Sequence, residues 1–203
     1  MRKYIDIINE AFVDVPLTPQ LKSWFGDSKV VDDNARPMLV FHGTSANIES
    51  FQHSNNGAGS RESKLGYWFT ENAEAAGNFA AFARSGGSGS NIVPVYLSIQ
   101  KPWYPETYRD IKDLVDRHTV FSSNTIIADR NIRMVQDKID YNGAISELRS
   151  KGYDGVILLN TKTDAPSSSE TINQYIVLSP NQIKSAFNNG NFDPTSEKIS
   201  EDV

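Results

Sequence analysis

The 203-residue chain contains no cysteine, and this absence removes several kinds of chemistry at once. Disulfide bonds, cysteine–zinc sites and a thiolate nucleophile are all excluded. Histidine is scarce as well, with 3 residues in the chain, so a histidine-rich metal site is not expected. Any chemistry that the protein performs must use oxygen, nitrogen and aromatic groups.

Long apolar runs are also missing. No stretch approaches the roughly 18 apolar residues that a membrane-spanning helix needs, and charged residues near the start interrupt any signal-peptide pattern. Lys and Arg number 20 against 25 Asp and Glu, which gives a net charge of -5. A mildly acidic chain is not suited to broad nucleic-acid binding, although it is compatible with a local basic patch. We therefore expect a soluble cytoplasmic enzyme or binding module with no membrane partner.

Short strands, helices and polar loops alternate along the chain, which predicts an α+β fold. The predicted helices span residues 18–25, 71–84, 106–118 and 141–150. The predicted strands span residues 38–41, 65–70, 92–99, 153–159 and 174–178, with a turn or short edge strand at 180–186. Two polar loops, at residues 52–64 and 160–173, exceed the usual connection length, and long loops in compact domains are usually functional or disordered.

The two ends of the chain differ from this core. Apolar residues recur at helical spacing before Pro16, which predicts an N-terminal helical appendage over residues 1–21. Thr18 and Pro19 are residue types that begin helices, so a second short helix is expected there. From residue 188 the chain is polar and aperiodic, and we expect residues 188–203 to form a flexible tail.

His42 stands at the end of a predicted buried strand and is followed by Gly43 and Thr44. A glycine lets a ligand reach the backbone N–H and C=O, so a strand-end histidine beside a glycine is a common binding geometry. The alternative is a structural histidine that bonds to a neighbouring loop. These residues alone leave both interpretations open.

One predicted strand is rich in aromatic residues, and strand alternation places Tyr67 and Phe69 on one face and Trp68 on the other. Two aromatic rings that flank a groove can sandwich a flat heterocycle, and Phe79 follows in the next predicted helix. These rings equally fit a hydrophobic core. Gln174 begins another apolar strand, where its side chain either hydrogen-bonds a sugar hydroxyl or is an ordinary exposed residue.

The order of these motifs resembles the ADP-ribosyltransferase superfamily, in its diphtheria-toxin and poly(ADP-ribose) polymerase branch with a His-Tyr-Glu constellation. The motifs are Phe41-His42-Gly43-Thr44, Gly66-Tyr67-Trp68-Phe69-Thr70, Asn78-Phe79 and Asn173-Gln174-Tyr175-Ile176-Val177. The stretch from Trp24 to Asp32 looks like phage- and prophage-encoded members. The resemblance covers roughly residues 22–187 and implies a catalytic domain with a split β-sheet core and flanking helices.

The resemblance implies a role for each matching residue. It places the adenosine ribose of NAD at His42, the nicotinamide carboxamide at the Gly43 backbone, and the nicotinamide ring between Trp68 and Phe79. The predicted catalytic residues are His42, Trp68 and Gln174. The residues expected to bind NAD are His42, Gly43, Thr44, Tyr67, Trp68 and Phe79. No metal is expected, and the loop at 160–173 lies where the family places its target-recognition loop.

Two departures from the family pattern bear on catalysis. Trp68 replaces the family tyrosine and keeps an aromatic face and an N–H donor but lacks the phenolic oxygen. Gln174 replaces the family glutamate, whose carboxylate stabilises the oxocarbenium-like state in which nicotinamide leaves the ribose. A glutamine holds the ribose hydroxyl without charge, so polymer elongation is not expected, whereas transfer of one ADP-ribose stays open. Glu170 and Asp164 on the preceding loop are candidates for the missing acid.

The resulting hypothesis is a mono-ADP-ribosyltransferase that uses NAD to modify a host macromolecule, as a phage-encoded effector or anti-defence factor in the host cytoplasm. A host protein is the expected target, and a nucleic acid is the second option, for which Arg61, Lys64 and Arg84 are the nearby basic residues. One alternative is a catalytically degenerate module that binds NAD or ADP-ribose without turnover. Another is a virion-associated interaction protein whose N-terminal helices matter more than any pocket.

Overall fold

A seven-stranded sheet forms the centre of the computed structural model, which describes residues 17–45, 47–52, 60–82, 91–120, 138–162, 171–188 and 190–200. The strands are β1 Val40–Thr44, β2 Tyr67–Thr70, β3 Asn91–Leu97, β4 Pro102–Trp103, β7 Gly155–Lys162, β8 Thr171–Val177 and β9 Ile183–Ser185. Their order across the sheet is β4-β7-β8-β2-β1-β3-β9, and all neighbours are antiparallel except β4 and β7. A separate pair consists of β5 Thr119–Val120 and β6 Lys138–Ile139.

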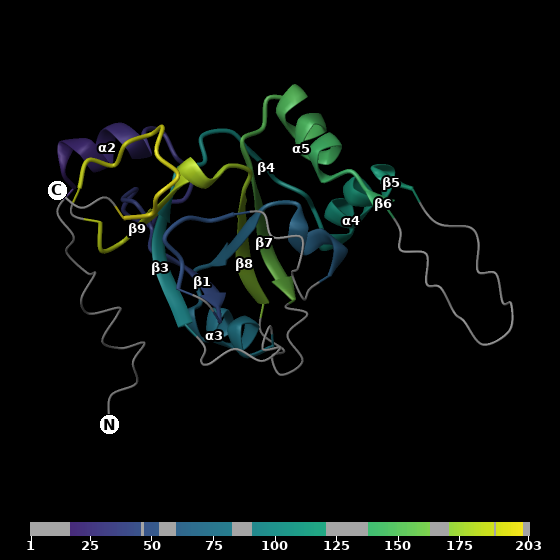
Figure 1. Ribbon diagram of the computed structural model, residues 1–203, viewed down its shortest axis with the longest axis horizontal. Coiled ribbons are helices and arrows are strands. Elements are labelled where there is room, and N and C mark those ends of the chain that lie inside the picture. Colours follow the sequence, from purple (N-terminus) through teal and green to yellow (C-terminus); the bar gives the residue numbers. More distant parts are fainter. Residues whose placement is uncertain are drawn as a thin grey trace, which may run out of the picture.

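Helices flank this sheet, as the sequence predicts for an α+β fold. They are α2 Pro19–Phe25, α3 Ala73–Phe82, α4 Tyr108–Arg117 and α5 Tyr141–Ser150, with short 3₁₀ helices η1 Arg61–Lys64 and η2 Pro180–Gln182. Figure 1 shows α2 beside β3 and β9 at one end, with α4 and α5 at the other. Among the described residues, no helix is both long enough and apolar enough to cross a membrane.

Local signals explain where several of these helices begin. The Thr18 hydroxyl accepts a hydrogen bond from the Leu21 N–H (3.1 Å), and Pro19 occupies the first turn of α2. Gly26, with a φ of 55°, follows the last residue of that helix, which ends at Phe25 as the predicted range 18–25 does. The Asp140 carboxylate caps α5 in the same way by accepting from the Gly143 N–H (2.9 Å). The predicted helix at 141–150 is therefore confirmed at both ends.

The sheet is divided between β1 and β2. The Phe41–Thr70 pair is the one residue pair that joins these strands, whereas β1 pairs with β3 along its whole length and β2 does so with β8. One half therefore contains β4, β7, β8 and β2, and the other contains β1, β3 and β9. This division confirms the predicted split sheet.

Each face of the sheet has its own apolar core. One face carries residues such as Val40, Phe69 and Tyr175 and packs around Phe51. The opposite face carries Phe41 under α3 in one half of the sheet. In the other half it is covered by α4 and α5, whose apolar residues include Ile111, Leu114, Ile145 and Leu148. Because paired residues share a face, α3 and the α4–α5 pair lie on the same side, one over each half.

Several element boundaries differ from the prediction. Strand β1 continues through His42 and Gly43 to Thr44 because these residues pair with β3. Strands β7 and β8 extend to Lys162 and from Thr171, so they take in residues that we predicted as loop. Helix α3 begins two residues later than predicted, because Asn72 accepts from the Ala75 N–H (2.9 Å) while Thr70 still belongs to β2. Residues 1–16 and 121–137 lie outside the described residues.

The C-terminal segment differs most from the sequence prediction. Residues 190–200, which we predicted as part of a flexible tail, pack against the domain, with Phe192 and Ile199 each 6% exposed. The Ile199 carbonyl accepts from the Ser185 N–H (2.7 Å), and the Ile199 N–H donates to the backbone carbonyl of Glu49 (3.0 Å). Two isolated apolar residues and backbone hydrogen bonds hold the segment, and neither produces a periodic pattern in the sequence.

A buried lysine fastens this segment to β9. Lys184 is fully buried, and its ammonium donates to the carbonyls of Ser196 (3.1 Å) and Lys198 (3.0 Å). We predict that Lys184→Met lowers the free energy of unfolding by about 2 kcal/mol, because charged hydrogen bonds to the segment are lost. Chemical denaturation measures this, and Lys22→Met on the exposed side of α2 is the matched control. An unchanged unfolding midpoint for Lys184→Met would contradict the assignment.

Candidate active site

The side chain of His42 lies where β1 and β2 separate. Its ring Nδ1 lies 2.8 Å from the backbone oxygen of Trp68, and because a carbonyl only accepts, Nδ1 carries the hydrogen. The ring stands edge-on to Phe51 and lies against Phe69, with centroids 5.0 Å and 5.5 Å away. Burial lowers the pKa of His42 below its ordinary value, and the bond to Trp68 opposes this shift. The imidazole is therefore neutral near pH 7, and its Nε2 is a hydrogen-bond acceptor.

The register of the sheet shows where the Gly43 backbone points. The Pro94 carbonyl accepts from the Ala186 N–H (3.0 Å), so the peptide groups of Pro94 face β9. The N–H and C=O of Phe41, which pairs with Pro94, therefore point away from β3 and toward β2. Peptide direction alternates along a strand, so Gly43 also presents its N–H and C=O to β2, where the β1–β2 register no longer contains a pair. A donor and an acceptor thus stand side by side at the split, which suits a carboxamide.

Gly43 is also required by the packing of α3. A β-carbon at this position would lie 1.8 Å from the Ala76 carbonyl oxygen and 2.9 Å from the Ala80 nitrogen. The glycine thus lets the α3 backbone press directly on β1. Phe79 lies in the same helix, between these two contacts in the sequence, and is half-buried.

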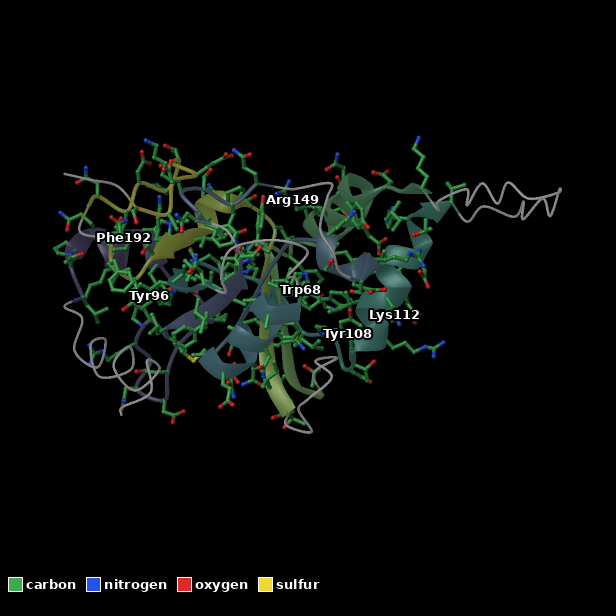
Figure 2. The ribbon with its side chains drawn as sticks, turned by 60° about the horizontal axis from the view of Figure 1, so that its bottom comes forward. Trp68, Tyr96, Tyr108, Lys112, Arg149 and Phe192 are labelled. Carbon is green, nitrogen blue, oxygen red and sulfur yellow. The ribbon has the colours of Figure 1, made fainter. Side chains whose placement is uncertain are left out.

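The aromatic strand divides its rings between the two faces as predicted. Tyr67 and Phe69 belong to one core, whereas Trp68 packs on the opposite face, where its ring centroid lies 6.2 Å from that of Tyr108. Figure 2 shows Trp68 and Tyr108 near each other on the side of α4. The Trp68 Nε1 is buried and has no hydrogen-bond partner among the described residues. An unsatisfied buried donor of this kind fits a ligand that brings an acceptor.

Tyr67 lies in the core rather than beside Trp68. It is 7% exposed, and its hydroxyl donates to the Phe51 carbonyl (3.3 Å). Burial, followed by the charge of Glu197, raises the pKa of Tyr67 to about 12. Tyr67 packs against Phe51, which in turn contacts His42. The role in NAD binding that the family pattern implies for Tyr67 stays a prediction.

Gln174 is in register with Thr70 and Phe41, the pair that joins the two halves of the sheet. It pairs with Thr70, which in turn pairs with Phe41, and it shares the face of Trp68. Its amide Nε2 donates to the Thr161 hydroxyl on β7 (2.9 Å), and the side chain is 8% exposed. His42, Gly43, Trp68 and Gln174 therefore lie on three adjacent strands, with the His42 ring on the Phe51 and Phe69 face and the side chains of Trp68 and Gln174 on the opposite face. The side chain at 174 is fixed and uncharged.

Other predicted residues are placed less centrally. Thr44 ends β1 opposite Asn91 and is half-buried. Arg61 lies in η1, where its guanidinium donates to the Thr119 hydroxyl (2.7 Å) and pairs with the Asp116 carboxylate (3.1 Å), so it is engaged within the fold. Glu170, Asp164 and Arg84 lie outside the described residues, as do most of the loops at 52–64 and 160–173.

Sequence reasoning missed a polar group that lies next to Trp68. The Tyr108 hydroxyl lies 3.1 Å from the Ser60 hydroxyl and donates to the Glu62 carboxylate (3.2 Å), and Glu62 is 3% exposed. Ser60 directly precedes η1 and Glu62 lies within it, whereas Tyr108 begins α4, so the residues are far apart in the chain and no local pattern links them. Within the described part of the chain, no group of three or more His, Asp or Glu side chains could hold a metal ion.

Comparison with known families agrees with this geometry. The family model described as ADP-ribosyltransferase in polyvalent proteins matches residues 32–192. The matched range begins after α2 and includes every residue that the resemblance placed in the site, and it confirms that resemblance. No curated protein and no solved structure matches the chain.

Proposed function

The chain belongs to the family of ADP-ribosyltransferases in polyvalent proteins, and from this membership we propose that it transfers one ADP-ribose from NAD to a host macromolecule. The family uses NAD as its substrate. The observation that carries the proposal is that a neutral His42 is followed by Gly43, whose N–H and C=O point toward β2 where the sheet splits. These two neighbours offer an acceptor for a ribose hydroxyl and a donor–acceptor pair for a carboxamide.

The reaction that fits these groups is the displacement of nicotinamide. The bond between the nicotinamide nitrogen and ribose C1′ breaks, and its electron pair leaves with neutral nicotinamide. The acceptor then forms a bond to C1′ and loses its proton to water. Because the leaving group is already activated on NAD, holding the ribose and the nicotinamide in the reactive orientation accounts for much of the acceleration.

Each residue of the site has a part in this orientation. His42 Nε2 accepts from a hydroxyl of the adenosine ribose, and the Gly43 backbone holds the carboxamide. Trp68 and Phe79 supply aromatic faces for the nicotinamide ring. Gln174 holds a ribose hydroxyl as a neutral partner. These assignments follow the family resemblance and are supported by the positions of the residues on adjacent elements.

The nature of the product and the target is part of the proposal. A neutral side chain at position 174 favours a single transfer over polymer growth. The family's occurrence in polyvalent proteins supports a phage-encoded effector or anti-defence factor acting in the host cytoplasm, with a host protein as the target. Incubation with labelled NAD and host lysate should give one labelled macromolecule, identified by intact-mass analysis. Absence of both transfer and NAD cleavage, with NAD binding intact, contradicts the proposal.

A binding module is the second candidate, and the fixed, uncharged Gln174 favours it. We predict that Gln174→Glu increases the turnover of a weakly active native protein by about 10-fold or more, because a carboxylate stabilises the ribose cation. Nicotinamide release measures this change, and Gln20→Glu at an exposed position of α2 is the control for a glutamine outside the site. A native protein that is inert until Gln174→Glu is introduced indicates the binding module.

A further inference from the structure

The ring of His42 is packed on one side by a residue that does not belong to the sheet. The Phe51 ring lies edge-on to the imidazole, with a centroid distance of 5.0 Å and an interplanar angle of 82°. The other ring against His42 is that of Phe69, which strand pairing fixes in β2. Phe51 follows β1 in the chain, and among the described residues no strand pair includes it. Its position therefore depends on other contacts.

Two sets of contacts hold Phe51 where it is. On the side of the sheet, the Tyr67 hydroxyl donates to the Phe51 carbonyl (3.3 Å), and the two rings are 5.3 Å apart. On the side of the chain, the Glu49 carbonyl accepts from the Ile199 N–H (3.0 Å), and a β-bridge between the same two segments adds to this bond. Phe51 and Ile199 also belong to one buried cluster. The residues directly before Phe51 are thus bonded to the C-terminal segment.

The C-terminal segment is in turn attached to β9. The Ile199 carbonyl accepts from the Ser185 N–H (2.7 Å), and the Lys184 ammonium donates to two further carbonyls of the segment. Figure 1 shows this part of the chain, in yellow, at the end of the domain that carries β9. Residues 196–199 therefore lie between β9 and the segment that carries Phe51. They lie beyond the end of the matched family range.

We propose that Phe51 is a positioning residue for His42, and that residues 196–199 keep Phe51 in that position. This inference rests on the proposed transferase function, in which His42 Nε2 accepts from the adenosine ribose. Because β1 has no partner in β2 at His42, the Nδ1 bond to Trp68 and the ring contacts decide where Nε2 points. The Phe51 ring restricts the imidazole before NAD arrives, so less ordering is required when NAD binds.

Phe51→Leu tests the contact, because leucine keeps the residue apolar and removes the ring beside His42. We expect the dissociation constant for NAD to rise about 10-fold, with kcat at saturating NAD changed by less than about 2-fold. An NMR titration of the His42 ring should show a pKa closer to its ordinary value, since water reaches an imidazole that has lost its cover. The matched control is Phe25→Leu in a separate cluster, at a residue that is 5% exposed against 4% for Phe51. It should change neither quantity.

Lys184→Met tests the part of the C-terminal segment. The segment loses two bonds to β9, while His42 and Phe51 stay unchanged. We expect the same two effects to a smaller degree, with the dissociation constant for NAD higher by about 3-fold, and Lys22→Met is again the control. The double variant Phe51→Leu, Lys184→Met should bind NAD no more weakly than Phe51→Leu alone, because both changes act through one ring.

The possible results separate this inference from the transferase function. An unchanged His42 titration in Phe51→Leu, or equal weakening of NAD binding in Phe51→Leu and Phe25→Leu, overturns the role of Phe51. Additive losses in the double variant overturn the role of residues 196–199. Because NAD binding and the titration need no turnover, a native protein that binds NAD without transfer contradicts the transferase function alone. A native protein that does not bind NAD overturns both.

Discussion

Replacing His42 by alanine should abolish ADP-ribose transfer and leave the domain folded. The variant loses the Nε2 acceptor for the ribose and also the bond from Nδ1 to Trp68 that keeps the ring at the split. We expect kcat/KM for NAD to fall about 100-fold or more, the effect of removing a preorganised polar group from an active site. Labelled-NAD transfer measures the activity, and calorimetric titration measures the affinity for NAD.

The matched control is His118→Ala, which removes an imidazole at the α4–α5 end. That ring bonds to the Glu147 carboxylate (2.8 Å) and lies outside the split of the sheet. Its activity should equal that of the native chain. If His42→Ala retains transfer, or if both alanine variants lose it equally, His42 is a structural residue of the kind that the sequence also allowed.

The buried imidazole also predicts a pH dependence. Burial lowers the pKa of His42 in the folded chain below the value of the unfolded chain, so folding favours the neutral form. The stability that this residue contributes is present above pH 6.5 and is lost as the pH falls below that value. Transfer measured from pH 8 downward should therefore persist to a lower pH than an unperturbed imidazole would allow, and it should fall once His42 is protonated.

Local patterns were sufficient to predict much of this fold. Helix caps such as Thr18 act on their own neighbours, and the alternation of Tyr67 and Trp68 depends on backbone geometry alone. The order of motifs then led to the split sheet and to His42. The helix caps and the strand alternation share one property, which is that the cause and the effect lie within a few residues of each other.

Features that depend on distant residues were not visible in the sequence. Ile199 is buried because Glu49 and Ser185 bond to its backbone, and nothing near Ile199 in the chain indicates this. Glu71 looks like an ordinary residue before a helix until the register places it beside Asn173. The same holds for the amide of Gln174, whose orientation depends on Thr161. Strand pairing decided each of these, and pairing is a tertiary property.

Gly43 matters to both the proposed site and the fold. Its backbone N–H and C=O are available to a ligand, and its lack of a side chain lets α3 pack closely on β1. The sequence predicted the first role, on the ground that a glycine bares the main chain. The close approach of α3 adds the second. Since the same residue positions the helix that carries Phe79, the distance between the two halves of the proposed nicotinamide site depends on it. A change at this position is therefore expected to affect stability and binding together.

Gly43→Ala should destabilise the domain by about 3 kcal/mol, near the upper end of the usual cost of overpacking a core. The new methyl group would stand 1.8 Å from the Ala76 oxygen, and both are attached to backbone, so neither can rotate away. Helix α3 must shift, which also moves Phe79 and weakens NAD binding. Thermal unfolding should show a melting temperature lower by about 6–12 °C for a chain of this size.

Gly77→Ala is the matched control for the prediction at Gly43. Gly77 lies in the same helix, and a β-carbon there would meet the Ile92 Cδ1 at 3.4 Å, an ordinary contact. Because alanine is the better helix former, this variant should be as stable as the native chain or more stable by about 0.5–1 kcal/mol. Equal stability of Gly43→Ala and Gly77→Ala would show that α3 does not press on β1. Loss of NAD binding with unchanged stability in Gly43→Ala would instead assign the glycine to the ligand alone.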